Sequence, residues 1–182
     1  MFEAATFERL ASLGTATLSS QLMKLGIRRH LIAGAAPVIG RGAIAGPAFT
    51  LRFIPGREDV SSGEQLAAPG SFMDSVDRAP AGSIVVAEAH RCADSGLVGD
   101  VMTLRMKVAG VAGFVTDGMV RDRVGLETVG LPIWAQGTTP PPAPQSLYFA
   151  GRELPVGVGG VAVFPGDIIV ADADGAIVVP PA

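Results

Sequence analysis

Residues 110–122 read Gly-Val-Ala-Gly-Phe-Val-Thr-Asp-Gly-Met-Val-Arg-Asp, and the fold class follows most directly from this stretch. Its apolar part, Ala112–Thr116, predicts a short buried strand that ends at Asp117-Gly118. The neighbouring strands and helices that we expect are, in chain order, Ile84–Ala87, Leu97–Ala109, Val120–Val129 and Ile133–Gln136. Strands and helices that alternate at this spacing predict parallel βαβ units, and therefore an α/β fold.

The chain before these units predicts two helices and a further strand. Residues 6–25 read as two helices separated by Gly14, and Thr15 or Thr17 would cap the second one. The elements expected next are the strand Ala48–Ile54, the polar loop Gly56–Gly70 and the short helix Phe72–Arg78.

The C-terminal residues predict a set of antiparallel strands. The expected strands are Gly160–Phe164, Asp167–Ala171 and Ala176–Val179. They are separated by Pro165-Gly166 and Asp174-Gly175, which we interpret as hairpin turns.

The length and composition predict one domain that covers residues 1–182 and associates with copies of itself. The 182 residues include 24 glycines and 14 prolines, but only 17% are charged and 48% are hydrophobic. This composition excludes a disordered chain. The mean hydropathy of +0.42 is higher than a lone soluble domain needs, so we expect apolar surface to be buried between subunits.

Several classes of protein are excluded by the distribution of charge and apolar residues. The net charge is −3, and the basic residues are scattered, so we expect no nucleic-acid partner. No apolar run reaches the roughly 18 residues of a membrane span. The N-terminal residues have no features of a signal peptide, and the single cysteine, Cys92, allows no internal disulfide. We therefore expect a cytoplasmic protein without a membrane partner.

Three weak motifs have structural interpretations that we prefer. Gly157–Ala162 matches the letters G-x-G-x-x-A, but no helix follows it, so we interpret it as a loop that enters a strand. Asp172–Gly175 resembles the start of a calcium loop but lacks the closing glutamate, and we interpret it as a hairpin turn. No sequence pattern links Cys92 to a histidine, so we expect an unreactive thiol.

The candidate site combines Gly99-Asp100 with Arg121-Asp122. Gly99 lies in the first turn of the expected helix Leu97–Ala109, where free N–H groups and the helix dipole favour an anion. Arg121-Asp122 follows a strand at its carboxyl end, where α/β sheets bind ligands. An arginine can hold an anionic oxygen, and a carboxylate can bind Mg²⁺. The alternative is that Asp122 only caps the next helix and Arg121 forms a surface ion pair.

These residues resemble the family that contains the class II HMG/CHA aldolases and the regulator of ribonuclease E activity A. The aldolase signature is an acidic residue, twenty intervening positions and Arg-Asp, which Asp100 and Arg121-Asp122 satisfy. Gly46–Thr50 and Pro165–Pro180 are similar to further blocks of the family, so the resemblance spans nearly the whole chain.

The resemblance implies a swivelling β/β/α fold and a homotrimer or hexamer with active sites between subunits. It implies a divalent metal, usually Mg²⁺ and alternatively Mn²⁺, with Asp122 as the metal ligand. Arg121 would hold the keto or enolate oxygen, and Asp100 would position a water for proton transfer. The substrate carboxylate would bind at the backbone amides around Gly99, Val101 and Met102.

The resemblance further implies a metal-dependent lyase that acts on a small 2-oxo acid through a pyruvate enolate. The expected reactions are aldol cleavage of 4-hydroxy-4-methyl-2-oxoglutarate or 4-carboxy-4-hydroxy-2-oxoadipate, and decarboxylation of oxaloacetate. One alternative is a non-catalytic protein that binds and inhibits ribonuclease E. Similar sequences also carry a demethylmenaquinone methyltransferase label, but no glycine-rich turn suited to S-adenosylmethionine follows the first strand.

Two features have no role in this interpretation. The prolines between 140 and 144 predict a surface loop, which we expect at a subunit contact. The chain ends at Ala182, where members of the family often continue into a C-terminal helix.

Overall fold

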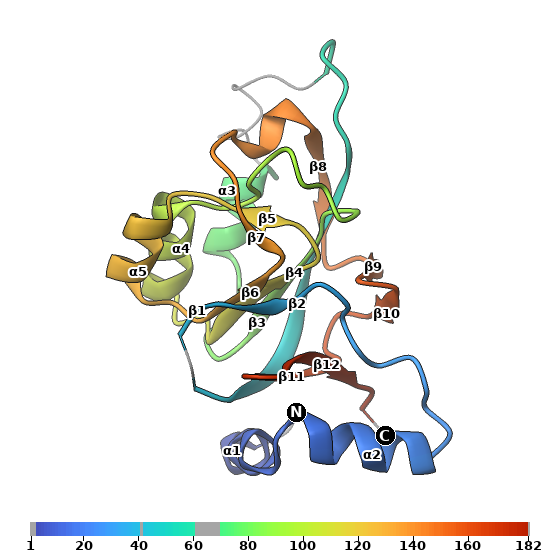
Figure 1. Ribbon diagram of the computed structural model, residues 1–182. Helices are drawn as coiled ribbons and strands as arrows, with labels where there is room; N and C mark the ends of the chain where they lie inside the picture. Colours follow the sequence, from blue (N-terminus) through green and yellow to red (C-terminus); the bar gives the residue numbers. More distant parts are fainter. Residues whose placement is uncertain (1–2, 41, 61–69, 182) are drawn as a thin grey trace.

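A curled mixed sheet forms the centre of the computed structural model, which describes residues 3–40, 42–60 and 70–181 (Figure 1). Its strands lie in the order β1-β6-β4-β3-β2-β11-β12, and β8 pairs with the far end of β2. The strand bounds are Ala36–Ile39 for β1, Ile44–Pro55 for β2, Ile84–Glu88 for β3, Gly113–Thr116 for β4, Ile133–Ala135 for β6, Leu147–Arg152 for β8, Ile168–Asp172 for β11 and Gly175–Val179 for β12.

The parallel βαβ units predicted from the sequence are confirmed. The strands β2, β3, β4 and β6 are neighbours and run parallel. Every residue of β3, β4 and β6 is buried, since both faces of the sheet are covered. Burial on both faces explains why these strands read as continuous apolar runs rather than as alternating patterns.

Helices cover one face of the sheet and a hairpin covers the other (Figure 1). The helices are α3 (Phe72–Asp77), α4 (Asp100–Val108) and α5 (Arg123–Val129). The hairpin consists of β9 (Val156–Val158) and β10 (Val161–Val163), and its valines pack with Val86, Val115 and Trp134 of the sheet. The apolar core therefore has two layers, with the sheet between them.

The N-terminal helices pack beneath β11 and β12 (Figure 1). They are α1 (Ala4–Leu13) and α2 (Thr15–Lys24), so the expected break at Gly14 is confirmed. The expected cap by Thr15 or Thr17 is wrong, because Gly14 occupies the N-cap position. Asp172 of β11 supplies the carboxylate instead. It accepts the Thr15 backbone N–H at 2.7 Å and the Thr15 hydroxyl at 2.8 Å.

Two predicted helices begin later than the sequence indicated. The helix expected from Leu97 begins at Asp100, with Gly99 at its N-cap, and the helix expected from Val120 begins at Arg123. Backbone pairing explains both differences. The Leu97 N–H donates to the Met119 carbonyl at 2.8 Å, and the Arg121 N–H donates to the Val98 carbonyl at 2.9 Å. These hydrogen bonds hold both segments in an extended form.

The tail pairs differently from the prediction around Pro165-Gly166. That turn does not form a hairpin, because β10 pairs with β9 whereas β11 pairs with β2 and β12. The hairpin at Asp174-Gly175 is confirmed. The interpretation of Gly157–Ala162 as a loop that enters a strand is wrong, because these residues form most of the β9–β10 hairpin, whose turn residues Gly159 and Gly160 have φ angles of 58° and 88°.

Some elements were not predicted from the sequence. The strand β1 and the first residues of β2 lie in a segment rich in glycine and proline, and β8 follows the proline run. Of the expected polar loop Gly56–Gly70, residues 61–69 lie outside the described residues. Among the residues that are described, no helix has the length and apolar character that a membrane span requires.

The contact between Asp172 and Thr15 predicts a pH-dependent stability. Burial alone would raise the pKa of Asp172, but hydrogen bonds from Thr15, Asp174 and Gly175 bring the pKa below its ordinary value. The carboxylate therefore contributes stability above about pH 4, and this contribution is lost as the pH falls through the folded-state pKa. We expect Asp172→Asn to lower the free energy of unfolding at pH 7 by about 1 kcal/mol.

Urea titrations at pH 7 and pH 3 measure this effect. The difference between the wild type and Asp172→Asn should shrink at pH 3. Asp174→Asn changes an exposed carboxylate in the same turn, and it should stay within about 0.5 kcal/mol of the wild type at both pH values. An equal loss of stability in Asp172→Asn at both pH values would contradict the assignment.

Candidate functional site

A cavity of about 250 Å³ lies at the carboxyl ends of β3, β4 and β6. The loops that follow these strands and the first turns of α3 and α4 form its wall. All of the predicted site residues line it, together with residues from α3 and the proline segment: Phe72, Met73, Gly96, Leu97, Gly99, Asp100, Val101, Met102, Arg121, Asp122, Pro142, Ala143 and Pro144. The structure thus brings the two predicted halves of the site into one cavity, where parallel sheets commonly bind ligands.

Pairing between the loops fixes the shape of this cavity. The short strands β5 (Met119–Val120) and β7 (Gly137–Thr138) run parallel. Gly96 forms bridges to Met119 and to Pro142, and its N–H donates to the Pro141 carbonyl at 2.8 Å. The proline segment, expected at a subunit contact, therefore lines the cavity of its own chain. A contact with a second subunit stays a prediction.

Arg121 and Asp122 form an ion pair that leaves groups of both side chains available to a ligand. Arg121 Nε lies 2.9 Å from Asp122 Oδ2, and the two side chains are 33% and 37% exposed. Within the described parts of the chain, Asp122 Oδ1 and the Nη groups of Arg121 have no hydrogen-bonding partner. The carboxylate does not cap α5, although Asp122 occupies its N-cap position. Of the alternative interpretation, the side-chain cap by Asp122 is therefore wrong, whereas an ion pair of Arg121 is present, with Asp122 as its partner.

Asp122 adopts a left-handed backbone, with φ 60° and ψ 45°. This conformation is uncommon for residues other than glycine, although aspartate tolerates it better than most. It allows the chain to turn directly from the extended segment into α5, with the carboxylate placed over Gly99. A Cβ atom at Gly99 would overlap Asp122 Oδ2. A side chain at position 99 would therefore displace the Asp122 carboxylate from this place.

Asp100 lies where the first turn of α4 contacts α5. Its Oδ1 accepts the Val101 N–H at 2.7 Å, and a Cβ atom at Gly125 would lie 2.8 Å from its Oδ2. The first-turn N–H groups of a helix have no carbonyl partners within the helix. Of the amides expected to bind a carboxylate, that of Val101 is therefore already used by Asp100.

Comparison with known proteins agrees with the motif. The profile of the RraA-like family, described as Aldolase/RraA, matches residues 15–178. The chain belongs to the RraA-like family.

Two proteins that are related to this chain by sequence are both longer than it. A protein of Halalkalibacterium halodurans, provisionally named 4-hydroxy-4-methyl-2-oxoglutarate aldolase, is 33% identical over 144 residues, which are 79% of this chain and 63% of that protein. Protein DlpA of Legionella pneumophila is 28% identical over 173 residues, which are 95% of this chain and 27% of that protein. The chain spans less than two thirds of either relative.

A solved structure confirms the expected fold class. RraAS2 of Streptomyces coelicolor, described as an unusual member of the RNase ES inhibitor RraA protein family, is 37% identical to this chain. Its crystal structure superposes with a TM-score of 0.87, covering 99% of this chain and 87% of that chain. The RraA-like fold therefore accounts for the arrangement in Figure 1.

Other polar residues near the site have internal partners. Asp117 is buried, and its carboxylate accepts the Ala89 N–H at 2.8 Å and the Gly159 N–H at 3.0 Å. Through these two hydrogen bonds, the Asp117 carboxylate links the residue after β3 to the turn of the β9–β10 hairpin. The Cys92 thiol donates to Asp94 at 2.9 Å, and this hydrogen bond lowers the pKa of Asp94. Cys92 is half-buried, and no hydrogen bond joins it to a histidine within the described residues; that its thiol is unreactive stays a prediction.

The sequence interpretation missed the apolar part of the wall. Phe72 and Met73 come from α3, and Pro142, Ala143 and Pro144 come from the proline segment. Neither segment belongs to the signature motif, and their place in the site depends on how distant loops pair. The only feature of the local sequence that marked either segment was the run of prolines between residues 140 and 144.

The two glycines beside Arg121-Asp122 should differ in their tolerance of a side chain. A Cβ atom at Gly96 would lie 2.8 Å from Arg121 Cβ and 2.9 Å from the Val120 carbonyl carbon, so backbone would have to move. We expect Gly96→Ala to lower the free energy of unfolding by about 1–3 kcal/mol. Gly99→Ala should have a smaller effect, because the end of the Asp122 side chain can rotate away. Urea denaturation compares the variants, and equal losses would contradict this view of the site.

Proposed function

We propose that the protein is a lyase that cleaves a small 2-oxo acid through a pyruvate enolate. The observation that carries this proposal is the pair Arg121–Asp122, which presents unpartnered Nη and Oδ1 atoms to a cavity beside the start of α4. A protein that only binds another protein has no need of this arrangement. The name given to the relative from Halalkalibacterium halodurans agrees with the proposal.

The residues in the cavity fit a magnesium ion. Mg²⁺ is usually bound through one or two carboxylates and keeps several of its waters. Asp122 Oδ1 would be the protein ligand, with Mn²⁺ as the alternative ion. The described residues contain no group of three or more His, Cys, Asp and Glu side chains that could hold a metal, which argues against a closed cage. When bound, the ion would supply Lewis-acid stabilisation of negative charge on the substrate oxygen.

The side chains of the cavity have separate roles in this reaction. The substrate carboxylate binds at the start of α4, where the Met102 N–H and the helix dipole favour an anion. The Nη groups of Arg121 donate to the C2 oxygen and stabilise the charge that develops there. Asp100 receives, through a water, the proton that the C4 hydroxyl loses.

In the aldol cleavage, the C3–C4 bond of the substrate breaks, and its electron pair forms the enolate of pyruvate. C4 becomes a carbonyl carbon as its hydroxyl loses a proton, and C3 then takes up a proton to give pyruvate. Loss of CO₂ from oxaloacetate gives the same enolate, so one site can carry out both reactions.

A second candidate function is binding and inhibition of a ribonuclease of the E type. It is favoured by the structure of RraAS2, which is described as a member of an RNase ES inhibitor family. The two functions respond differently to a change at Asp122. Inhibition through an outer surface would survive loss of this carboxylate, whereas the lyase reaction would not.

We also propose that copies of the chain associate, as a trimer or hexamer, through the outer surface of α4 and α5. Large apolar side chains are exposed there: Val101 is 62% exposed, Leu104 52%, Val124 78% and Val108 80%. Val101 also lines the cavity, so a second subunit on this surface would lie beside the site.

The lyase proposal predicts a specific loss of activity in Asp122→Asn. Pyruvate release from oxaloacetate and from 4-hydroxy-4-methyl-2-oxoglutarate should require Mg²⁺, stop in EDTA and fall by about 100-fold or more in the variant. A lactate dehydrogenase-coupled assay measures pyruvate. Asp174→Asn, which changes an exposed carboxylate in the β11–β12 turn, should retain wild-type activity. Undiminished release in Asp122→Asn would refute the proposal.

The association proposal predicts that acidic residues on α4 and α5 separate the subunits. We expect Val108→Asp combined with Val124→Asp to reduce the mass measured by light scattering to that of a single chain. Both residues are more than three-quarters exposed, so the change should not unfold the chain. Leu25→Asp, at a residue 76% exposed beyond α2, is the matched control and should leave the mass unchanged. A wild type that is already monomeric would contradict the proposal.

A further inference from the structure

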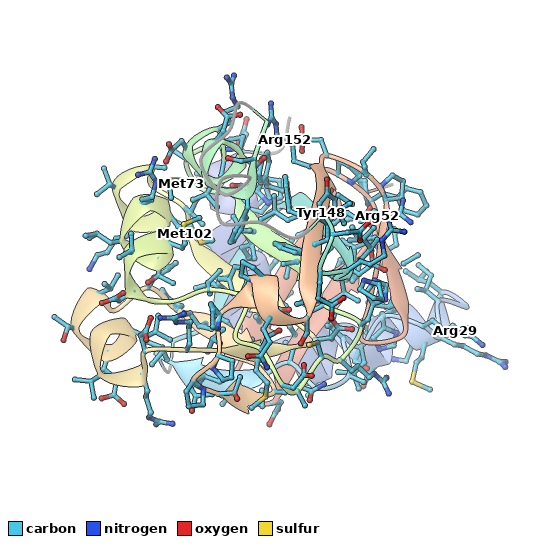
Figure 2. The ribbon with its side chains drawn as sticks, turned by 90° about the horizontal axis from the view of Figure 1, so that it is seen from above. Arg29, Arg52, Met73, Met102, Tyr148 and Arg152 are labelled. Carbon is cyan, nitrogen blue, oxygen red and sulfur yellow. The ribbon has the colours of Figure 1, made fainter. Side chains whose placement is uncertain are left out.

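The short helix α3 forms one side of the cavity, beside the start of α4. Phe72 and Met73 of α3 line the cavity, and so does Met102 of α4. Figure 2 shows Met73 and Met102 close together between the two helices, and both side chains are half-buried. A ligand at the start of α4 therefore meets hydrocarbon on this side. How closely this wall approaches the ligand depends on the position of α3 relative to α4.

The position of α3 depends on contacts with other elements. The helix has only six residues, and a helix of this length is not stable alone. The Phe72 ring lies 5.1 Å from the ring of Phe53 in β2 and 5.8 Å from that of Phe149 in β8. Val76 is fully buried in the same core cluster. These apolar contacts hold α3 against the sheet.

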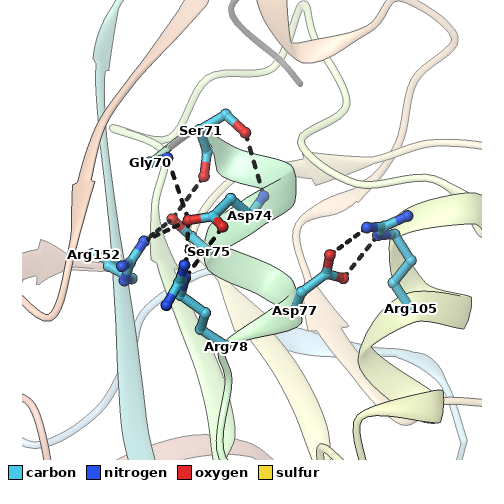
Figure 3. Close-up of polar contacts among 8 residues, drawn as sticks. All are labelled: Gly70, Ser71, Asp74, Ser75, Asp77, Arg78, Arg105 and Arg152. Carbon is cyan, nitrogen blue, oxygen red and sulfur yellow. Dashed lines mark hydrogen bonds and ion pairs between the residues drawn. The ribbon is translucent and has the colours of Figure 1, made fainter. Parts of the chain in front are cut away.

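Two carboxylates of α3 face arginines of neighbouring elements (Figure 3). Asp74 pairs with Arg152 of β8 at 3.2 Å and with Arg78, directly after α3, at 3.0 Å. Arg105 of α4 donates from Nε to Asp77 Oδ1 at 2.9 Å and from an Nη group to Asp77 Oδ2. Two such hydrogen bonds to one carboxylate fix the orientation of the pair as well as its distance. Among the described residues, this ion pair alone joins α3 to α4.

The ion pair lies on the same helix faces as the two methionines. Asp77 follows Met73 by four positions in α3, and Arg105 follows Met102 by three positions in α4, spacings that place side chains on one face of a helix. The methionines line the cavity, whereas Asp77 and Arg105 lie outside it. The two side chains of the pair are 46% and 37% exposed, so removal of one charge leaves no buried charge behind.

We propose that Asp77 and Arg105 are positioning residues for the site. Their ion pair holds α3 against α4, so that Met73 and Met102 stay packed against a bound substrate. This inference rests on the proposed lyase function. The two methionines contact the carbon chain of the substrate both before and during cleavage. Loss of the pair therefore weakens substrate binding and leaves the chemical step almost unchanged.

Steady-state kinetics of pyruvate release test the inference. Asp77→Asn should raise KM for oxaloacetate by about threefold or more, while kcat stays within about twofold of the wild type. Arg105→Gln should have the same effect, and the double variant should be no worse than either single variant, because all three lose one interaction. Glu127→Gln, the matched control, breaks an exposed ion pair with Arg123 inside α5 and should leave both constants unchanged.

Hydrogen exchange measured by mass spectrometry shows whether α3 is the part that moves. In Asp77→Asn, the amides of residues 72–77 should exchange about fivefold or more faster than in the wild type. The amides of β3 should exchange at the same rate in both proteins. The aromatic contacts of Phe72 remain in the variant, so we expect it to stay folded.

The outcomes separate this inference from the proposed function. If the wild type releases pyruvate but KM is unchanged in Asp77→Asn, the inference is overturned and the lyase proposal stands. A fall in kcat without a rise in KM, or a raised KM with unchanged exchange in α3, would also overturn the inference. If the wild type releases no pyruvate, the lyase proposal and the inference both fall.

Discussion

The geometry of the site depends on backbone pairing between two loops. The Leu97 N–H bonds to Met119, and the Arg121 N–H bonds to Val98, so both segments stay extended beyond the ends of β3 and β4. Because of this pairing, α4 begins only at Asp100 and α5 only at Arg123. Leu97, Gly99, Arg121 and Asp122, which precede the two helices, form part of the wall of the cavity. Had α5 begun at Val120, where its pattern starts, Arg121 would lie in the first turn of that helix.

Glycines permit this close arrangement. Gly96 lies against the backbone of Val120, Gly99 against the carboxylate of Asp122, and Gly125 against Asp100. In each case a side chain would occupy space that the site already fills. Three of the 24 glycines thus have a local explanation in the close contacts of this site. The charged side chains Asp100, Arg121 and Asp122 lie together near the starts of α4 and α5. The aromatic cluster around Phe72 keeps the neighbouring part of the cavity wall apolar.

Local patterns predicted the parallel strands and the elements of the signature motif, because these depend on neighbouring residues. Ile84–Ala87 and Ala112–Thr116 are apolar enough to identify buried strands, and both lie where expected. Asp100 and Arg121-Asp122 were found through their spacing and line one cavity as predicted. Features that depend on distant contacts were not predicted. The cap of α2 comes from Asp172, and the turn at Pro165-Gly166 joins two sheets, since the partners of β10 and β11 lie elsewhere in the chain.

The bond between Asp172 and Thr15 also has a consequence for synthesis of the chain. The two residues are separated by 157 positions. The helix α2 packs on β11 and β12, whereas α1 also contacts β2. Chains are made from the N-terminus, so α2 leaves the ribosome long before the strands that cover it exist. Until those strands emerge, Leu18 and Leu22 lack most of their native contacts. This early helix is therefore among the last parts to reach its final place.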